Sequence, residues 1–444
     1  MTPGCMDCRA THVMTAISRQ VAFLETGKIA PSNFFESSHM TILFQTFAND
    51  SDTLPTPCQL SAAQARRPSG ARRLARAVAG AATATLVALM VGCASDAPVK
   101  EAPLPVWPAP PELARVKFVR TLVDDGDLNK DMTASRKMLN FLSGEAAPTN
   151  RITEPMGIAV SDDGHRVYVS DFAQMAVFIF DFEKKTSIKV GGAQNPLAGP
   201  MGIALDGDEN FYVAETAGKG LQVFDKTGKH LRNITHESIE RPIGVAIDIP
   251  RGKLYVADTG RAESFEHTIK IFDLQGKLLG KIGKQIGDIT GSFLFPTWIT
   301  VDTQGNLYVA DTLNSRVQKF DPDGKYLMSF GKRGNGFGMF DKPKGVGVDS
   351  FGNVYVSDTG WSNVQIFNAQ GDVLMYFGGR GTALGLMQNP SVLTIDKQNR
   401  IYVGDVLNHR VNVYQLVNTK AEDSALKTDT DAKAAEDAKA TSAK

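Results

Sequence analysis

Residues 296–330 read PTWITVDTQGNLYVADTLNSRVQKFDPDGKYLMSF. Four short runs rich in Val, Ile, Tyr and Phe follow one another in this stretch, at 299–301, 306–310, 317–320 and 326–330. Two turn sequences, Asp302-Thr-Gln-Gly305 and Asp321-Pro-Asp-Gly324, separate strands, since glycine accepts positive φ and aspartate can bond the backbone that follows it. The pattern predicts one sheet of four short strands.

The same order of features recurs six times along the chain. The copies begin at Pro155, Pro200, Pro242, Pro296, Pro343 and Pro390. Each contains a Tyr-Val pair and, two residues after the Val, an acid: Asp171, Glu215, Asp258, Asp311, Asp358 and Asp405. Intervals of 45, 42, 54, 47 and 47 residues are too long for helical hairpins and suit four-stranded units. The sequence therefore predicts an all-β fold, a six-bladed β-propeller.

The sixth copy ends without a fourth strand. Its third strand is expected at 411–414, and residues 417–423 have no strand pattern. Upstream of the first copy, residues 115–122 read RVKFVRTL and alternate as the fourth strands do. We therefore expect this N-terminal strand to close the last blade and remove an edge that would otherwise favour aggregation.

The repeats resemble the NHL family of propellers. The resemblance rests on 309–317 (VADTLNSRV), 403–411 (VGDVLNHRV) and 343–349 (PKGVGVD), and it covers about residues 115–417. Blade five keeps Asp358 and Asn363 but has Gln365 where the Arg-Val pair would end, and blades one and two depart further. The resemblance implies a six-bladed ring whose function lies in variable loops.

Residues 1–92 are interpreted as a leader. Five arginines between 66 and 76 precede an apolar run at 77–91, which ends in Gly92 and Cys93. This order, within about 66–92, resembles a bacterial lipoprotein signal peptide, whose cleavage would leave Cys93 for lipid attachment. A buried helix or a transmembrane segment is the alternative, although the run is short for a bilayer. Residues 1 to about 60 resemble an over-extended gene start.

The remaining domain boundaries follow from composition. Residues 93–113 form a lipidated, Pro-rich linker, 114–417 the propeller, and 418–444 a disordered charged tail. A short helix is expected at 132–142. All four cysteines lie at or before Cys93, which agrees with an envelope protein that faces the periplasm. Ala94 after the cysteine favours the outer membrane over the inner one.

Charge gives no sign of a polyanionic partner. The chain has 48 basic and 48 acidic side chains, and removal of residues 1–92, with 8 and 5 of them, leaves 40 and 43. Nucleic acid is therefore not expected as a partner. A local basic patch, or ordinary solvated loop charge, is formed by Lys332, Arg333, Lys342, Lys344 and Arg380.

The best candidate binding surface is the face that carries the loops between strands two and three and the crossovers between blades. Its longest segments are 331–342, 378–389 and the insertion 261–267. The candidate ligand-binding residues are Trp298, Trp361, Arg333, Arg380, Asp311, Asn314, Arg316, Asn408 and Arg410. For the repeated Asp, Asn and Arg, the alternative is a structural role in the loops.

A glycine-rich segment and two tryptophans also stand out in the repeats. The glycines at 334, 336 and 338 link strands rather than open a helix, so they are not a nucleotide fingerprint, and Phe337 and Phe340 are expected to pack beneath them. Trp298 replaces a repeated glycine and, like Trp361, could plug the ring or stack on a ligand.

No cofactor, metal site or catalytic residue is predicted. Related amidating lyases hold a central metal through several histidines, but His165, His230, His236, His267 and His409 occupy unequal repeat positions. The favoured function is a membrane-anchored scaffold, attached through Cys93, for a protein or envelope component. The alternative is a hydrolase or lyase in the central channel, and the oligomeric state stays open.

Overall fold

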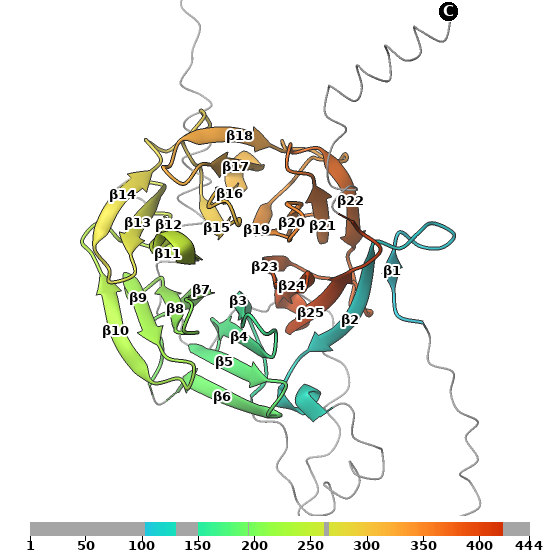
Figure 1. The fold of residues 1–444 in the computed structure, drawn as a ribbon, viewed down its shortest axis with the longest axis horizontal. Helices are drawn as coiled ribbons and strands as arrows, with labels where there is room; N and C mark the ends of the chain where they lie inside the picture. Colours follow the sequence, from blue (N-terminus) through green and yellow to red (C-terminus); the bar gives the residue numbers. More distant parts are fainter. Residues whose placement is uncertain (1–102, 130–149, 194, 262–265, 421–444) are drawn as a thin grey trace, which may run out of the picture. The chain divides into compact units, whose positions relative to one another are not determined.

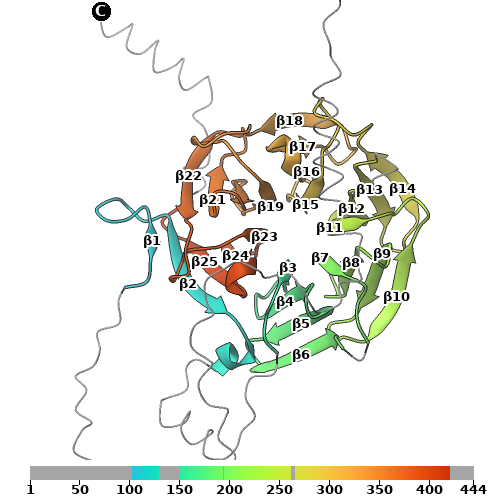
Figure 2. The ribbon, with the colours of Figure 1, turned by 180° about the vertical axis from the view of Figure 1, so that it is seen from behind.

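The computed structural model describes residues 103–129, 150–193, 195–261 and 266–420. Within these ranges the strands form six antiparallel sheets arranged radially around a central axis, as Figure 1 and, from behind, Figure 2 show. The predicted six-bladed β-propeller is thereby confirmed, and its blades are numbered in chain order.

Blade one comprises β3 (Pro155–Val160), β4 (Arg166–Asp171), β5 (Ala176–Asp181) and β6 (Thr186–Gly191). Blade two comprises β7 (Pro200–Leu205), β8 (Phe211–Glu215), β9 (Gly220–Phe224) and β10 (His230–Thr235). Blade three comprises β11 (Pro242–Asp248), β12 (Lys253–Asp258), β13 (Thr268–Asp273) and β14 (Leu278–Ile282). Blade four comprises β15 (Pro296–Val301), β16 (Leu307–Asp311), β17 (Arg316–Phe320) and β18 (Tyr326–Phe330). Blade five comprises β19 (Pro343–Val348), β20 (Val354–Asp358), β21 (Asn363–Phe367) and β22 (Val373–Gly378). Blade six comprises β23 (Pro390–Ile395), β24 (Arg400–Asp405), β25 (Arg410–Leu416) and the N-terminal strands β2 (Val116–Leu122) and β1 (Val106–Trp107). Four 3-10 helices in the described ranges are η1 (Asp125–Asn129), η2 (Ile249–Arg251), η3 (Thr312–Asn314) and η4 (Val406–Asn408).

The last blade closes as predicted. β2 pairs antiparallel with β25 from Val116 opposite Leu416 to Leu122 opposite Val411, and it takes the place of a fourth strand (Figure 1). The sequence did not indicate β1, which lies in the segment predicted as linker and pairs with β2. Its Trp107 packs edge-on against Tyr414, with ring centroids 5.8 Å apart. The ring is therefore joined by hydrogen bonds between its two ends.

The tyrosines of the Tyr-Val pairs form the buried centre of each blade. Tyr308, Tyr355 and Tyr402 are at most 2% exposed, and their hydroxyls donate to the first aspartate of the preceding turn. The acceptors are Asp302 at 3.2 Å, Asp349 at 3.0 Å and Asp396 at 3.1 Å. Because a buried hydroxyl needs such a partner, one contact links the turn signal and the strand signal of the repeat.

The innermost strands approach one another closely. A Cβ added at Gly244 would lie 2.3 Å from the carbonyl oxygen of Thr297, so this position of blade three accepts only glycine without a shift of the backbone. The equivalent residue of blade four is Trp298. This exception places a large side chain at the lining of the central channel.

Several predictions concern residues outside the described ranges. These are the signal peptide and lipid site at Cys93, the helix at 132–142, residues 262–265 of the insertion, and residues 421–444 of the tail. In the part of the chain that is described, no helix has the length and apolar character needed to cross a membrane.

Candidate functional site

The acid at the end of each second strand holds the crossover that enters the same blade. Asp258 accepts the backbone N–H groups of Glu240 and Arg241, both at 2.9 Å. Asp358 accepts those of Asp341 at 2.8 Å and Lys342 at 3.1 Å. Burial raises the pKa of both carboxyls, and the backbone donors act in the opposite direction. These repeated acids therefore hold the crossovers of the loop face against the ends of the second strands.

In blade four the predicted Asp, Asn and Arg form one network. Asp311 is fully buried, and its Oδ2 accepts Asn314 Nδ2 and Arg316 Nε, each at 2.8 Å. The Arg316 guanidinium also donates to the carbonyls of Asp288 at 2.8 Å and Ser292 at 3.1 Å. Burial raises the pKa of Asp311, whereas its bonds with Asn314, the backbone and Arg316 lower it. These contacts fit a structural role in the loop, which was the alternative to ligand binding.

Blade six repeats this network. Asp405 Oδ2 accepts Asn408 Nδ2 at 2.6 Å and Arg410 Nε at 3.2 Å. Arg410 donates in turn to the carbonyls of Thr382, at 3.0 Å, and Leu386, at 2.6 Å. Arg410 is only 8% exposed, so this guanidinium is committed to its own loop.

Blade five lacks this network, and Asn363 is not its repeated asparagine, contrary to the prediction. Asn363 lies opposite Asp358, as Arg316 lies opposite Asp311. Asn363 therefore stands at the arginine position, and Trp361 stands at the asparagine position. The signal was present in the sequence, because counting five residues from each repeated Asp gives Arg, Asn and Arg in blades four, five and six.

Trp361 keeps one contact of the asparagine it replaces. Its indole Nε1–H donates to the carbonyl of Gly334 at 3.0 Å, and Asn314 and Asn408 donate to the corresponding carbonyls of blades four and six. The side chain is nevertheless 43% exposed. Much of the ring is thus open on the loop face, as a stacking residue requires.

Two further aromatics lie beside this loop. Phe337 is 68% exposed, so the prediction that it packs beneath the glycines is wrong, whereas Phe340 is fully buried as predicted. The Phe337 ring contacts that of Tyr376, which is 48% exposed, with centroids 5.4 Å apart. We call Phe337, Trp361 and Tyr376 the aromatic patch. Tyr376 could not be singled out from the sequence, because alternate residues of an outer strand face solvent whether or not they bind a partner.

The predicted arginines lie next to the aromatic patch. Arg333 and Arg380 are exposed, and Arg380 donates to the carbonyl of Gly360, the residue before Trp361, at 3.1 Å. Lys344 belongs elsewhere, because it is the second residue of the innermost strand β19. Burial lowers the pKa of Lys344, and the nearby Lys342 lowers it further. The predicted basic patch is thus divided between the loop face and the ring centre.

Trp298 belongs to the apolar lining of the central channel. It packs in one cluster with Met201, Ile243 and Val392, which come from the innermost strands of blades two, three and six. The side chain is 6% exposed, and its buried Nε1 has no hydrogen-bond partner within the described ranges. Of the two roles considered for Trp298, its burial fits packing in the ring better than stacking on a ligand.

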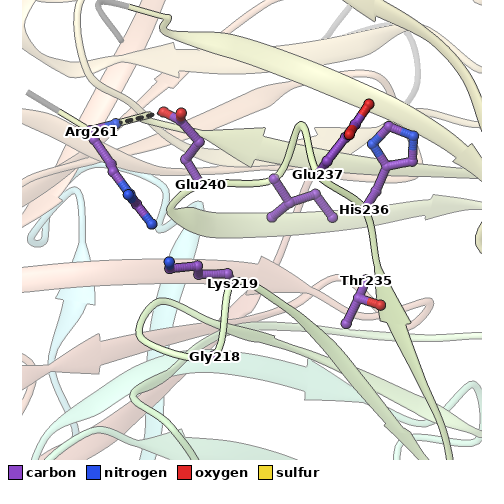
Figure 3. A pocket seen from close by; sticks show the side chains of 8 residues that line it. Gly218, Lys219, Thr235, His236, Glu237, Glu240 and Arg261 are labelled. Atoms are coloured by element: carbon purple, nitrogen blue, oxygen red, sulfur yellow. Dashed lines mark hydrogen bonds between the residues drawn. The ribbon is translucent and has the colours of Figure 1, made fainter. Parts of the chain in front are cut away.

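A pocket of about 540 Å³ opens between the loops of blades two and three (Figure 3). It is lined by Gly218, Lys219, Thr235, His236, Glu237, Ile239, Glu240 and Arg261. The backbone N–H of Arg261 donates to Glu240 Oε2 at 2.9 Å. Charges of both signs line this open pocket, so it selects no simple class of ion.

The five histidines of the propeller lie apart, each with a local contact. His267 Nδ1 accepts the N–H of Phe295 at 2.9 Å, and His230 and His236 bond Asn233 and Ser238. Across the described residues, no three His, Cys, Asp or Glu side chains are grouped to hold a metal ion. The arrangement does not fit the histidine-held metal of the amidating lyases.

Comparisons with known families agree with the repeat pattern. Residues 293–320 match the model of the NHL repeat, and residues 142–260 match that of the SMP-30/Gluconolactonase/LRE-like region. The chain thus carries an NHL repeat in blade four, and the resemblance stated from the sequence is confirmed.

Two curated relatives are similar over part of their length. The Drosophila melanogaster protein brain tumor is 28% identical over 137 residues, which are 30% of this chain and 12% of that protein. The Arabidopsis thaliana chloroplastic protein SUPPRESSOR OF QUENCHING 1 is 25% identical over 187 residues, 40% of this chain and 15% of that protein. The chain therefore spans a small fraction of either relative.

Solved structures with some similarity include three described here. A structural genomics protein from Bacteroides thetaiotaomicron has a TM-score of 0.49 at 17% identity, covering 60% of this chain and 70% of its own. A streptogramin B lyase has a TM-score of 0.45 at 12% identity and coverages of 60% and 94%. Virginiamycin B lyase from Staphylococcus aureus has a TM-score of 0.43 at 16% identity and coverages of 61% and 87%.

Proposed function

We propose that the chain is an envelope lipoprotein, anchored through Cys93 and facing the periplasm, whose loop face over blades four to six binds a protein or another envelope component. The outer membrane is favoured over the inner one. The anchor rests on the sequence order of arginines, apolar run and cysteine. The propeller supplies a rigid frame for the loops.

The aromatic patch carries the binding proposal. Phe337, Trp361 and Tyr376 expose between 43% and 68% of their surface, and Arg333 and Arg380 lie next to them. Exposed aromatic rings beside arginines are typical of the energetically important centre of protein interfaces. An isolated exposed apolar residue needs no explanation, but a contacting pair of exposed rings, with a third exposed ring bonded to the same loop, favours a partner.

Affinity capture from solubilised membranes tests this proposal. The full-length lipoprotein is compared with the double variant Phe337→Ser and Trp361→Ser, and with a control in which the exposed Ile188 of blade one is changed to Ser. We expect the double variant to lose a specific partner at least tenfold and the control to retain it. Equal recovery by all three proteins would mean that the patch is not the binding surface.

A hydrolase or lyase with a site in the central channel is the second candidate. Its support is the SMP-30/Gluconolactonase/LRE-like match together with Lys344, an innermost-strand lysine whose pKa is lowered by burial. A screen of the full chain against lactones and lyase substrates, with Lys344→Met as the comparison, tests it. Turnover that disappears in Lys344→Met would favour this candidate over a binding scaffold.

A further inference from the structure

Three crossovers on the loop face fold as the same short loop. We call residues 287–292, 334–339 and 381–386 the carbonyl loops of blades four, five and six. In each loop the last residue donates its N–H to the carbonyl three positions earlier, at 3.0 or 3.1 Å: Ser292 to Ile289, Met339 to Gly336 and Leu386 to Ala383. The first N–H also bonds the residue after the loop in all three cases. Their backbone carbonyls are therefore arranged alike.

An arginine from the third strand binds this loop in blades four and six. Arg316 donates to the second, third and last carbonyls of its loop, those of Asp288, Ile289 and Ser292, at 2.8 to 3.2 Å. Arg410 makes the same three bonds to Thr382, Ala383 and Leu386, at 2.6 to 3.1 Å. The carbonyl loop thus has the geometry of a guanidinium receptor, and the chain demonstrates it twice.

Blade five keeps the loop without the arginine. Asn363 stands at that position, and its Oδ1 is buried with no hydrogen-bond partner among the described residues. Among the residues that the structure describes, the fully buried Asp358 accepts only backbone N–H groups, whereas its counterparts Asp311 and Asp405 each pair with arginine. Asn363 Oδ1 is thus a buried acceptor without a donor, which is costly, so this site favours a donor supplied from outside.

The surroundings of the blade-five loop suit an incoming cation with an apolar neighbour. Trp361 stands where Asn314 stands in blade four, and Asn314 shares the Asp311 oxygen with Arg316, so the exposed indole lies beside the arginine position. Aromatic faces attract guanidinium groups. Phe337, in the middle of the carbonyl loop, offers apolar contact for the residue that carries the cation.

Arg333, which directly precedes the blade-five loop, does not exclude a second guanidinium. The equivalent residue of blade six is Arg380, which directly precedes Gly381. Arg380 donates away from its own loop, to the carbonyl of Gly360, while Arg410 occupies that loop. A basic residue at this position is therefore compatible with a bound arginine.

We infer that the carbonyl loop of blade five binds an arginine side chain of a separate partner protein, in the way that Arg316 and Arg410 bind the loops of blades four and six. Arginine is favoured over lysine because its planar fork carries several donors that reach different carbonyls at once. The inference rests on the proposed function, since it names the side chain that a partner would place beside the aromatic patch.

The test uses the full chain labelled with 5-fluorotryptophan, which gives one ¹⁹F signal for each of its three tryptophans. The signal of Trp361 is assigned with Trp361→Phe. The probes are the acetylated, amidated tripeptides Leu-Arg-Leu, Leu-Lys-Leu and Leu-citrulline-Leu. We expect Leu-Arg-Leu to shift the Trp361 signal saturably, with the citrulline peptide at least tenfold weaker. An equal response to arginine and citrulline would overturn the inference.

Two variants of one residue provide the matched control. Asn363→Arg supplies the blade with its own guanidinium, so it should raise Tm and lose the response to Leu-Arg-Leu. Asn363→Ala shortens the same side chain without occupying the loop, and it should respond within about threefold of the unchanged protein. A full response from Asn363→Arg would contradict the inference even if both variants fold.

The outcomes also separate this inference from the proposed function. If Leu-Arg-Leu leaves the Trp361 signal unmoved while partner capture still depends on Phe337 and Trp361, the arginine site is wrong and the binding surface stands. If the chain associates with itself and Asn363→Arg abolishes that association, the occupant is a second copy, and the separate partner is excluded.

Discussion

His267 stands at the end of the blade-three insertion, 7% exposed, with its Nδ1 accepting the N–H of Phe295. Burial lowers its pKa to about 4, and the charge of Arg241 acts in the same direction. In the unfolded chain a histidine titrates near pH 6.5. Below that pH the unfolded state takes up a proton that the folded state resists, so the folded protein loses stability as the pH falls.

We therefore predict that His267 costs the protein roughly 3 kcal/mol of stability between about pH 6.5 and pH 4. Urea unfolding of the full chain at several pH values measures this loss. His267→Gln keeps a hydrogen-bond acceptor and does not titrate, so its curve should fall less over the same window. The buried carboxyls, whose pKa values are raised, act alike in both proteins. Parallel curves would show that His267 is not the group responsible.

A single repeat position explains why the loops of blades four, five and six differ. Arg316, Asn363 and Arg410 occupy one repeat position, yet only the arginines can bond their own loops. One substitution thus separates a self-contained loop from one that leaves an acceptor buried. It changes no strand, because strand formation depends on the alternating apolar residues around it.

At the scale of elements, β2 carries the closure of the ring. Its Val116, Phe118 and Leu122 are at most 1% exposed, and Phe118 packs edge-on against Tyr414 with centroids 5.6 Å apart. We predict that deleting residues 115–122 lowers Tm sharply, and that Phe118→Ala alone costs about 3 to 5 kcal/mol. Thermal and urea unfolding measure both.

Lys117 provides the control for this strand. It lies between two buried residues of β2 and is exposed, so Lys117→Ala should change stability by less than about 0.5 kcal/mol. An unfolding transition that the deletion leaves unchanged would show that the pairing of β2 with β25 does not stabilise the ring.

The elements also show what the sequence could predict. Turn pairs such as Asp302 and Gly305, with the Tyr-Val pairs between apolar runs, predicted the blades and the closing strand, because these signals act within a few residues. β1 was missed because Val106–Trp107 is a two-residue strand among prolines. The exposure of Phe337 was missed because a crossover has no periodicity from which its direction can be inferred.

The candidate site was predictable only in part. Trp361 was found as an interruption of the repeat, and Arg333 and Arg380 as loop charges. The sequence leaves two roles open for Trp298, to plug the ring or to stack on a ligand, and the packing of innermost strands from several blades buries the side chain. Such packing depends on contacts between residues far apart in the chain, which local patterns do not contain.

At the scale of the whole molecule, Cys93 is predicted to attach the propeller to the membrane. Cys93→Ala should release the protein from the membrane fraction and abolish incorporation of a radiolabelled fatty acid, because this thiol is the predicted attachment point of the diacylglycerol. Cys58→Ala, which changes another cysteine before the predicted cleavage point, is the matched control. Continued membrane association of the Cys93→Ala protein would show that something other than a lipid holds it.

The pairing of β2 with β25 also sets the order of events during synthesis. Val116 meets Leu416, 300 residues later, so the closing contact waits until nearly the whole propeller has left the ribosome and, in an exported protein, has been translocated. Until then the last blade lacks its outer strand, and β25 and β2 each present an unpaired edge. A chain that stops before residue 410 lacks β25 altogether, and its unpaired β2 would mark it for chaperones and proteases rather than for the mature pool.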